Sequence, residues 1–157
     1  MKAVADSSVL IFFSKMGRLG LLCELFKVIA SRAVVAEVLA GKESHPEGMG
    51  NFESFISGRR IKVFPGGGHA LGEDATIALA TSKKIPVVLM DDYVGCRKAR
   101  LHGLKIYGCP FILLLALQKK IISKAEFDGL LDLLLSFNYF ISPALLRKIT
   151  AAAEKLS

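Results

Sequence analysis

The sequence has no apolar run long enough to cross a membrane. Its most apolar stretch, Cys109 to Leu117, is far shorter than the ~20 residues that a membrane-spanning helix needs, and Lys119 and Lys120 follow it. The N-terminal segment MKAVADSSVLIFF carries a charge at Asp6 and lacks the small-residue cleavage site of a secretory signal. We therefore expect a cytoplasmic protein that makes no membrane contact.

Cysteine is scarce and irregularly placed. Cys23, Cys96 and Cys109 are odd in number, widely spaced, and form no CxxC or Cys/His pattern. This spacing argues against a disulfide framework and against a structural zinc site. Free thiols are the expected state of all three.

The chain is long and apolar enough to form one compact domain. Its 157 residues are 52% hydrophobic, and we expect residues 1–157 to share a single core. The formal net charge is +7, from 21 lysines and arginines against 14 aspartates and glutamates. A basic protein of this kind suits a polyanionic partner, although charge alone is also compatible with a basic protein that binds no nucleic acid.

Short apolar runs alternate with segments of helical period. Runs that predict strands are Lys2 to Ala5, Ile61 to Phe64, Pro86 to Met90 and Leu104 to Tyr107. Helices are predicted at Val9 to Phe13, Leu19 to Val28, Val34 to Leu39, Asn51 to Ser57, Leu71 to Lys83, Tyr93 to His102, and from Phe111 onward with breaks near Ser123 and Ser142. We read Lys42 to Gly50 as an exposed loop and Pro65 to His69 as a flexible linker. The alternation predicts an α/β fold of three layers, with a central parallel sheet of about four to five short strands flanked by helices.

Acidic residues stand where the predicted strands end. Asp6 ends the first strand, and the pair Asp91 and Asp92 ends the strand from Pro86 to Met90. Glu73 lies in the first turn of a helix that follows another strand, and Glu37 stands alone in the apolar segment RAVVAEVLAG. In open parallel sheets, ligands bind beyond the carboxyl ends of the strands. These carboxylates are therefore candidates for one shared site.

Each carboxylate also has an ordinary structural explanation. The side chain of Asp6 could cap the following helix, and that of Asp92 could cap the helix after its strand. Glu37 could face solvent on the surface of its helix. Glu73 is able simply to favour the helix dipole, in which case the neighbouring Asp74 is the participant. That all four explanations hold at once is a much stronger requirement than that any one of them holds.

Convergence of the carboxylates would call for divalent cations. Their mutual repulsion destabilises an empty pocket unless cations neutralise it or some groups stay protonated. Oxygen ligands without histidine or cysteine are the pattern for Mg²⁺ or Mn²⁺. Such ions activate water and stabilise the charge that develops in phosphodiester hydrolysis, so the pattern favours a nuclease.

Four segments, in this order, resemble the acidic motifs of PIN-domain proteins: VADSSVLIFF, VVAEVL, LGEDATIALA and VVLMDDYVGCRKA. The likeness is greatest to the prokaryotic toxin-type (VapC-like) ribonuclease branch. The segment from Gly103 to Gly108 and the ending FNYFISPALLRKI are also similar to that branch, so the resemblance covers nearly the whole chain. It implies a PIN-like fold, Mg²⁺ or Mn²⁺ dependence, endoribonuclease activity on RNA, a frequent homodimer and, for many members, an antitoxin protein that blocks the pocket.

The resemblance assigns roles to individual positions. Asp6, Glu37 and Glu73 match the first three acids, and the fourth is either Asp92, which we favour, or Asp91. Ser8 matches a small polar residue that supports the first acid. Cys96 stands where relatives have a basic residue, which leaves the set Arg97, Lys98 and Arg100 to contact phosphate or merely to form a solvated helix face.

Two other functions remain in competition with the nuclease. One is a catalytically silent PIN scaffold that binds RNA or a protein partner, for which salt-sensitive RNA binding without turnover is expected. The other is a receiver-like or phosphatase domain, which also places carboxylates and Mg²⁺ at strand ends. The position of the acidic pair after a late strand, with Asp6 alone after the first, argues against the receiver.

Overall fold

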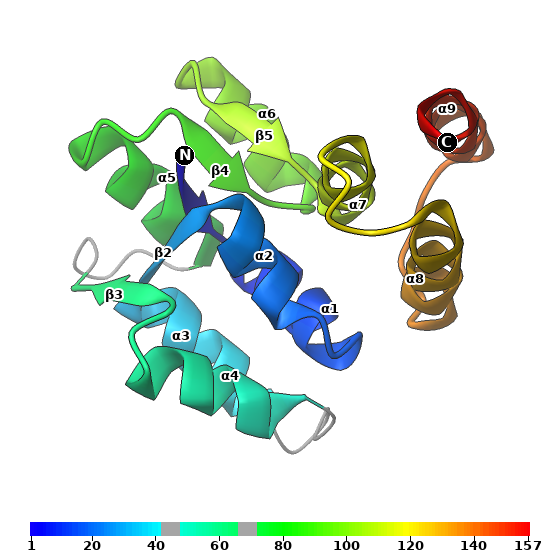
Figure 1. Cartoon of the computed structure of the whole chain (residues 1–157). Coiled ribbons are helices and arrows are strands. Elements are labelled where there is room, and N and C mark those ends of the chain that lie inside the picture. Colours follow the sequence, from blue (N-terminus) through cyan, green and yellow to red (C-terminus); the bar gives the residue numbers. More distant parts are fainter. Residues whose placement is uncertain (42–47, 66–71) are drawn as a thin grey trace. The chain divides into compact units, whose positions relative to one another are not determined.

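The computed structural model describes residues 1–41, 48–65 and 72–157, and of Gly72 and Glu73 it describes the backbone alone. Contacts divide the chain into two compact units, Met1–Gly108 and Cys109–Ser157, which are described in turn (Figure 1). That the whole chain forms a single domain stays a prediction.

The first unit is built on a five-stranded parallel sheet of order β3-β2-β1-β4-β5. The strands are β1 (Lys2–Ala5), β2 (Lys27–Ser31), β3 (Lys62–Phe64), β4 (Val87–Leu89) and β5 (Lys105–Tyr107). The helices of this unit are α1 (Ser7–Lys15), α2 (Leu19–Leu25), α3 (Arg32–Ala40), α4 (Met49–Ser57), α5 (Gly72–Ser82) and α6 (Tyr93–Leu101). The predicted α/β class with a central parallel sheet is confirmed.

The two central strands are buried on both faces. Ala3 to Ala5 of β1 and all of β4 are buried, as expected for parallel strands covered by helices on each side. On one face, Val4 and Val88 pack with Ile77 and Ala80 of α5 and with Ala99 of α6. This packing holds α5 and α6 against the strands whose ends carry the acidic residues.

The strand β2 corrects a sequence-based prediction. A helix was expected from Leu19 to Val28, but α2 ends at Leu25 and Lys27–Ser31 joins the sheet. Phe26 and Ile29 continue the helical spacing of α2, so periodicity alone did not separate the two elements. The β-branched Val28 and Ile29 favour the strand, and the run is buried from Val28 to Ser31.

The predicted loop from Lys42 to Gly50 is only partly described. Residues 42–47 lie outside the described residues, whereas Met49 and Gly50 belong to α4 and Met49 is buried. That part of the loop prediction is wrong. Gly48 precedes α4 with φ 79°, and a Cβ there would lie 1.8 Å from the carbonyl oxygen of Ser14, so only glycine fits. The predicted linker also falls outside the described residues from Gly66 onward.

The second unit consists of α7 (Cys109–Gln118), α8 (Lys124–Ser136) and α9 (Pro143–Leu156). Both α8 and α9 contact α7. The capping box of Ser123 and Glu126 opens α8, and Ser142 caps α9, so the predicted helix breaks are confirmed. Within the described ranges, none of the helices combines the length and the apolar character needed to span a membrane.

Candidate active site

Asp6 and Asp91 lie at the ends of neighbouring strands. Ala5 of β1 pairs with Leu89 of β4 in parallel register, and the backbone N–H of Asp6 donates to the carbonyl of Leu89 at 2.8 Å. Asp6 follows β1 directly, and Asp91 comes two residues after β4. The sheet therefore places both acids at its carboxyl end, as their position in the sequence predicts.

Asp6 is a buried carboxylate that does not cap its helix. It is 4% exposed, and its side chain makes no capping hydrogen bond to α1. Instead Thr76 of α5 donates its hydroxyl to Asp6 Oδ1 at 3.1 Å. Burying a charged carboxylate is unfavourable unless polar partners or cations compensate, so the capping explanation for Asp6 fails and a binding role gains support.

Glu37 is exposed and contacts the residue that follows Asp6. The buried residues of α3 are Val34, Val35 and Val38, and Glu37 faces away from them. The expectation that Glu37 is embedded in apolar surroundings is therefore wrong, because the apolar residues occupy another face of the helix. Its side chain accepts a hydrogen bond from Ser7 Oγ at 2.9 Å. Since Ser7 follows Asp6, this contact brings Glu37 to the carboxyl end of β1.

Asp92 caps α6, whereas Asp91 is half-buried beside it. The Oδ2 atom of Asp92 accepts from the backbone N–H of Gly95 at 2.7 Å, and Asp92 is exposed. The capping explanation for Asp92 is thus observed. Capping involves one of the two carboxylate oxygens, and the choice between Asp91 and Asp92 as metal ligand stays a prediction.

The thiol of Cys96 lies within the electric field of three of these carboxylates. Burial raises the pKa of Cys96, Arg100 lowers it, and Asp91, Asp92 and Asp6 raise it further. The thiol itself donates to the carbonyl of Met90 at 3.6 Å. Cys96 and these three aspartates therefore belong to the same end of the sheet. We call Asp6, Glu37, Asp91 and Asp92 the carboxylate edge.

The remaining members of the predicted site are described less completely. The side chain of Glu73 lies outside the described residues, but its backbone is in α5, three positions before Thr76. Ser8 Oγ is buried and has no hydrogen-bond partner among the described residues. The hydroxyls that contact the acids belong to Ser7 and Thr76, which sequence reasoning did not assign. Ser7 directly follows Asp6, which was the available signal, whereas the Thr76 contact depends on tertiary packing.

The chemical type of the donors at the carboxylate edge suits a hard divalent cation. The carboxylate edge offers carboxylate oxygens, and the buried Ser8 hydroxyl lies two residues from Asp6. Oxygen donors of this kind suit Mg²⁺ or Mn²⁺. In the part of the chain whose side chains are described, which excludes Glu73, no three histidine, cysteine or acidic residues are close enough together to hold a metal ion.

The basic residues of α6 have separate surroundings. Lys98 forms an ion pair with Asp74 at 3.1 Å, and the Asp74 side chain is 55% exposed. This pairing leaves Asp74 a weaker substitute for Glu73. The guanidinium of Arg97 lies 5.9 Å from the ring centroid of Tyr93, and Arg100 is exposed near Cys96. The helix is thus a basic surface next to the carboxylate edge.

Residues 2–155 match the family DUF3368, described as a PIN domain. The chain belongs to this PIN-domain family. PIN domains are generally nucleases, so the fold is of a nuclease type, and the family gives no support to the receiver-like alternative.

Other comparisons are more distant. A solved domain of a functionally unknown protein from Methanocaldococcus jannaschii is similar over 69% of this chain and 91% of its own, with 20% identity and a TM-score of 0.44. This likeness is too distant to inform function. No curated protein sequence is significantly similar to the chain.

Proposed function

We propose that this PIN-domain chain is a Mg²⁺- or Mn²⁺-dependent endoribonuclease that hydrolyses RNA phosphodiester bonds. The observation that carries the proposal is the buried carboxylate of Asp6 at the carboxyl end of β1, supported by Thr76. Glu37 and Asp91 lie at the same end of the sheet. The proposed metal ligands are Asp6, Glu37, Glu73 and Asp92, with Asp91 as the alternative fourth acid.

The surrounding residues would prepare the acids for a cation. A bound divalent ion would supply an activated water and stabilise the charge that develops on the phosphate. Thr76 fixes the orientation of Asp6 by donating to one of its oxygens, and Ser7 does the same for Glu37. Fixed acceptors reduce the reorganisation that metal binding requires.

The substrate and partners follow from charge and from the resemblance to toxin-type ribonucleases. Arg97, Lys98 and Arg100 lie on the helix that begins at Asp92, where they would contact phosphates beside the scissile bond. We further propose that the protein acts in the cytoplasm as a homodimer, as the toxin of a toxin-antitoxin pair. An antitoxin protein would then cover the carboxylate edge.

The test is metal-stimulated cleavage of single-stranded RNA by the whole chain. Asp6→Asn and Glu37→Gln each keep the shape of the side chain and remove a ligand charge, and both should abolish cleavage in Mn²⁺. Asp132→Asn, at an exposed position of α8, is the matched control and should cleave like the wild type. Circular dichroism and thermal unfolding establish that the variants are folded. Cleavage that persists in both Asp6→Asn and Glu37→Gln would overturn the proposal.

The second candidate is a PIN scaffold that binds RNA or a protein without cleaving. The capping role of Asp92 and the cysteine at position 96 favour it, because each departs from a complete acidic and basic site. Salt-sensitive RNA binding without turnover in Mn²⁺ would support this candidate in place of the nuclease.

A further inference from the structure

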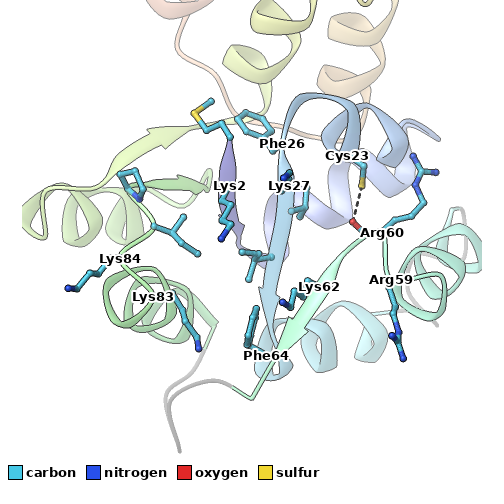
Figure 2. Close-up of a pocket in the computed structure, with 15 residues that line it drawn as sticks. Lys2, Cys23, Phe26, Lys27, Arg59, Arg60, Lys62, Phe64, Lys83 and Lys84 are labelled. Atoms are coloured by element: carbon cyan, nitrogen blue, oxygen red, sulfur yellow. Dashed lines mark hydrogen bonds between the residues drawn. The ribbon is translucent and has the colours of Figure 1, made fainter.

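A basic cavity lies on the first unit, away from the carboxylate edge. Its volume is about 810 Å³, and Figure 2 shows the side chains that line it. No aspartate or glutamate of the described residues lines it. The basic residues around it are Lys2, Lys27, Arg59, Arg60, Lys62, Lys83 and Lys84.

Three of these cations come from the starts of three neighbouring strands. Lys2, Lys27 and Lys62 are the first residues of β1, β2 and β3. Lys2 pairs with Lys27, and Lys62 pairs with Ile29, which lies two residues after Lys27. Because alternate residues of a strand face the same side, all three lysines belong to one face of the sheet.

The other four cations come from two helix ends. Arg59 and Lys84 follow α4 and α5 in the left-handed conformation, with φ of 57° and 55°, and their neighbours Arg60 and Lys83 complete the set. This position after a helix usually holds glycine, because other side chains are strained there. The chain thus presents a cation at two positions where glycine would be easier to accommodate. Figure 2 shows the two helix ends on either side of the strand lysines.

The seven cations lack compensating charge within the described structure. None of them forms an ion pair with a described carboxylate, and all seven are exposed. Gathering like charges around one cavity is unfavourable unless an anion balances them. The cavity therefore has the electrostatics of an anion-binding site.

Aromatic and apolar side chains form the rest of the wall. The ammonium groups of Lys62 and Lys83 lie 4.8 Å and 4.7 Å from the ring centroid of Phe64, which is half-buried. Ile85 and Pro86 also line the cavity. An aromatic ring among cations is the combination with which proteins bind single-stranded nucleic acids, where bases stack and phosphates pair.

We propose that the basic cavity binds single-stranded RNA, as a second contact beyond the carboxylate edge. The cations come from separate segments around a volume that far exceeds one phosphate, which favours a string of phosphates over a single anion. Phe64 ends β3, so the cavity reaches from the starts of β1 and β2 to the carboxyl end of a neighbouring strand. Strands of this length span roughly 10–17 Å, so one RNA strand can contact both regions. The choice of RNA rests on the proposed function.

The test compares two lysines in the same backbone conformation. Lys84→Gly removes a cation of the cavity, and Lys120→Gly removes one from the end of α7, where Lys120 has φ 58° and does not line the cavity. Glycine adopts a positive φ without steric strain at both positions, so neither variant should be less stable than the wild type. Binding of a fluorescent single-stranded RNA is measured by anisotropy in EDTA, without divalent metal and thus without metal-dependent cleavage.

We expect Lys84→Gly to weaken RNA binding about five-fold at 0.1 M salt. The slope of the logarithm of the binding constant against the logarithm of the salt concentration should fall by about one, which corresponds to the loss of one phosphate contact. The double variant Arg59→Gly/Lys84→Gly should lose more, and Lys120→Gly should bind like the wild type. Equal affinities for Lys84→Gly and Lys120→Gly would overturn the inference and leave the carboxylate edge untouched. Competition by inorganic phosphate as effective as competition by RNA would also overturn it, because the cavity would then be a small-anion site.

Cys23 offers an independent readout within the cavity. Its half-buried thiol lines the cavity and donates to the carbonyl of Arg60 at 3.6 Å. At an RNA concentration that saturates the wild type but not Arg59→Gly/Lys84→Gly, alkylation of Cys23 should slow in the wild type and much less in the double variant, as measured by peptide mass spectrometry. Unchanged alkylation of Cys23 at saturating RNA would contradict the proposed position. If RNA binding is weakened by Lys84→Gly and not by Lys120→Gly, but the wild type cleaves no RNA in Mn²⁺, the proposed RNA-binding cavity stands and the proposed nuclease activity is contradicted.

Discussion

The carboxylate edge and the basic cavity carry opposite charges and are built from opposite ends of the strands of one sheet. The carboxylate edge gathers acids after β1 and β4, whereas the basic cavity gathers lysines that begin β1, β2 and β3. Each region contains a half-buried cysteine. Burial raises the pKa of both thiols, and one arginine lowers each of them, Arg100 at Cys96 and Arg60 at Cys23; Cys96 differs because three aspartates also raise its pKa. A parallel sheet separates charge in this way because all its strands start at one end and finish at the other.

The largest expected effect is on RNA cleavage, where a change at the carboxylate edge should affect catalysis and a change at the basic cavity should affect substrate binding. Asp6→Asn should lower kcat for RNA cleavage by more than about 100-fold, the upper range for losing a residue that merely supports a metal ligand. Lys84→Gly should raise KM about five-fold and leave kcat unchanged, because it removes binding that substrate and transition state share. Steady-state cleavage kinetics in Mn²⁺ give both constants. A fall in kcat with unchanged KM for Lys84→Gly would contradict the assignment of substrate binding to the basic cavity and of catalysis to the carboxylate edge.

A smaller effect concerns stability at the carboxylate edge. Thr76→Val keeps the side-chain shape but removes the hydroxyl that donates to buried Asp6. We expect a loss of about 1.5–3 kcal/mol in the free energy of unfolding, the range for hydrogen bonds to charged groups. Urea denaturation measures this quantity.

The matched control is Thr81→Val on the same helix. Thr81 donates to the carbonyl of Ile77 within α5, and its loss leaves no buried charge without a donor. It should change the free energy of unfolding by less than about 0.5 kcal/mol, as surface substitutions usually do. Equal decreases in the free energy of unfolding for Thr76→Val and Thr81→Val would show that the hydrogen bond to Asp6 stabilises the fold no more than an ordinary surface hydrogen bond.

The sequence predicted the sheet and the place of the acids better than their surroundings. Asp6 and Asp91 follow short apolar runs typical of buried strands, so their position at the carboxyl end follows from local pattern and parallel topology. The strand β2 was missed because its residues continue the spacing of the preceding helix. The hydrogen bonds from Ser7 and Thr76 join residues 30 and 70 positions apart. The place of Ser7 directly after Asp6 is a local signal that it lies near the site, but no local signal marks Thr76 or the partner of either hydroxyl.

The basic cavity could not be predicted from the sequence. Its cations come from four separate stretches of the chain, and each lysine or arginine looks like an ordinary solvated residue at the start of a strand or the end of a helix. Only strand register brings Lys2 beside Lys27. The sequence instead pointed to Arg97, Lys98 and Arg100, which are adjacent on one helix and therefore visible as a cluster.

A third prediction concerns the fourth acid of the carboxylate edge. Asp92→Ala should lower the free energy of unfolding by about 1 kcal/mol, because it removes the cap of α6, whereas Asp92→Asn should be nearly neutral because asparagine caps equally well. RNA cleavage then identifies the ligand. Loss of cleavage in Asp92→Asn with intact stability assigns the metal to Asp92, and retained cleavage assigns it to Asp91.

The smallest expected effect tests the electrostatic contrast between the two cysteines. Arg60 lowers the pKa of Cys23, so Arg60→Gln should raise that pKa and reduce the thiolate fraction at a given pH. Alkylation of Cys23 should slow by less than about ten-fold, because one pKa unit already changes the thiolate fraction ten-fold and an exposed charge is screened by salt. The hydrogen bond from the thiol to the backbone of residue 60 is retained in this variant.

Arg100→Gln is the counterpart at the carboxylate edge, where Arg100 lowers the pKa of Cys96. It should slow alkylation of Cys96 and leave Cys23 unchanged, as read by peptide mass spectrometry over a pH series. With Arg100 absent, the three aspartates raise the pKa of the Cys96 thiol unopposed, so alkylation of Cys96 should require a higher pH in Arg100→Gln than in the wild type. An unchanged pH dependence would mean that burial alone sets the reactivity of this thiol, and the contrast drawn from the sheet would not extend to the chemistry of its thiols.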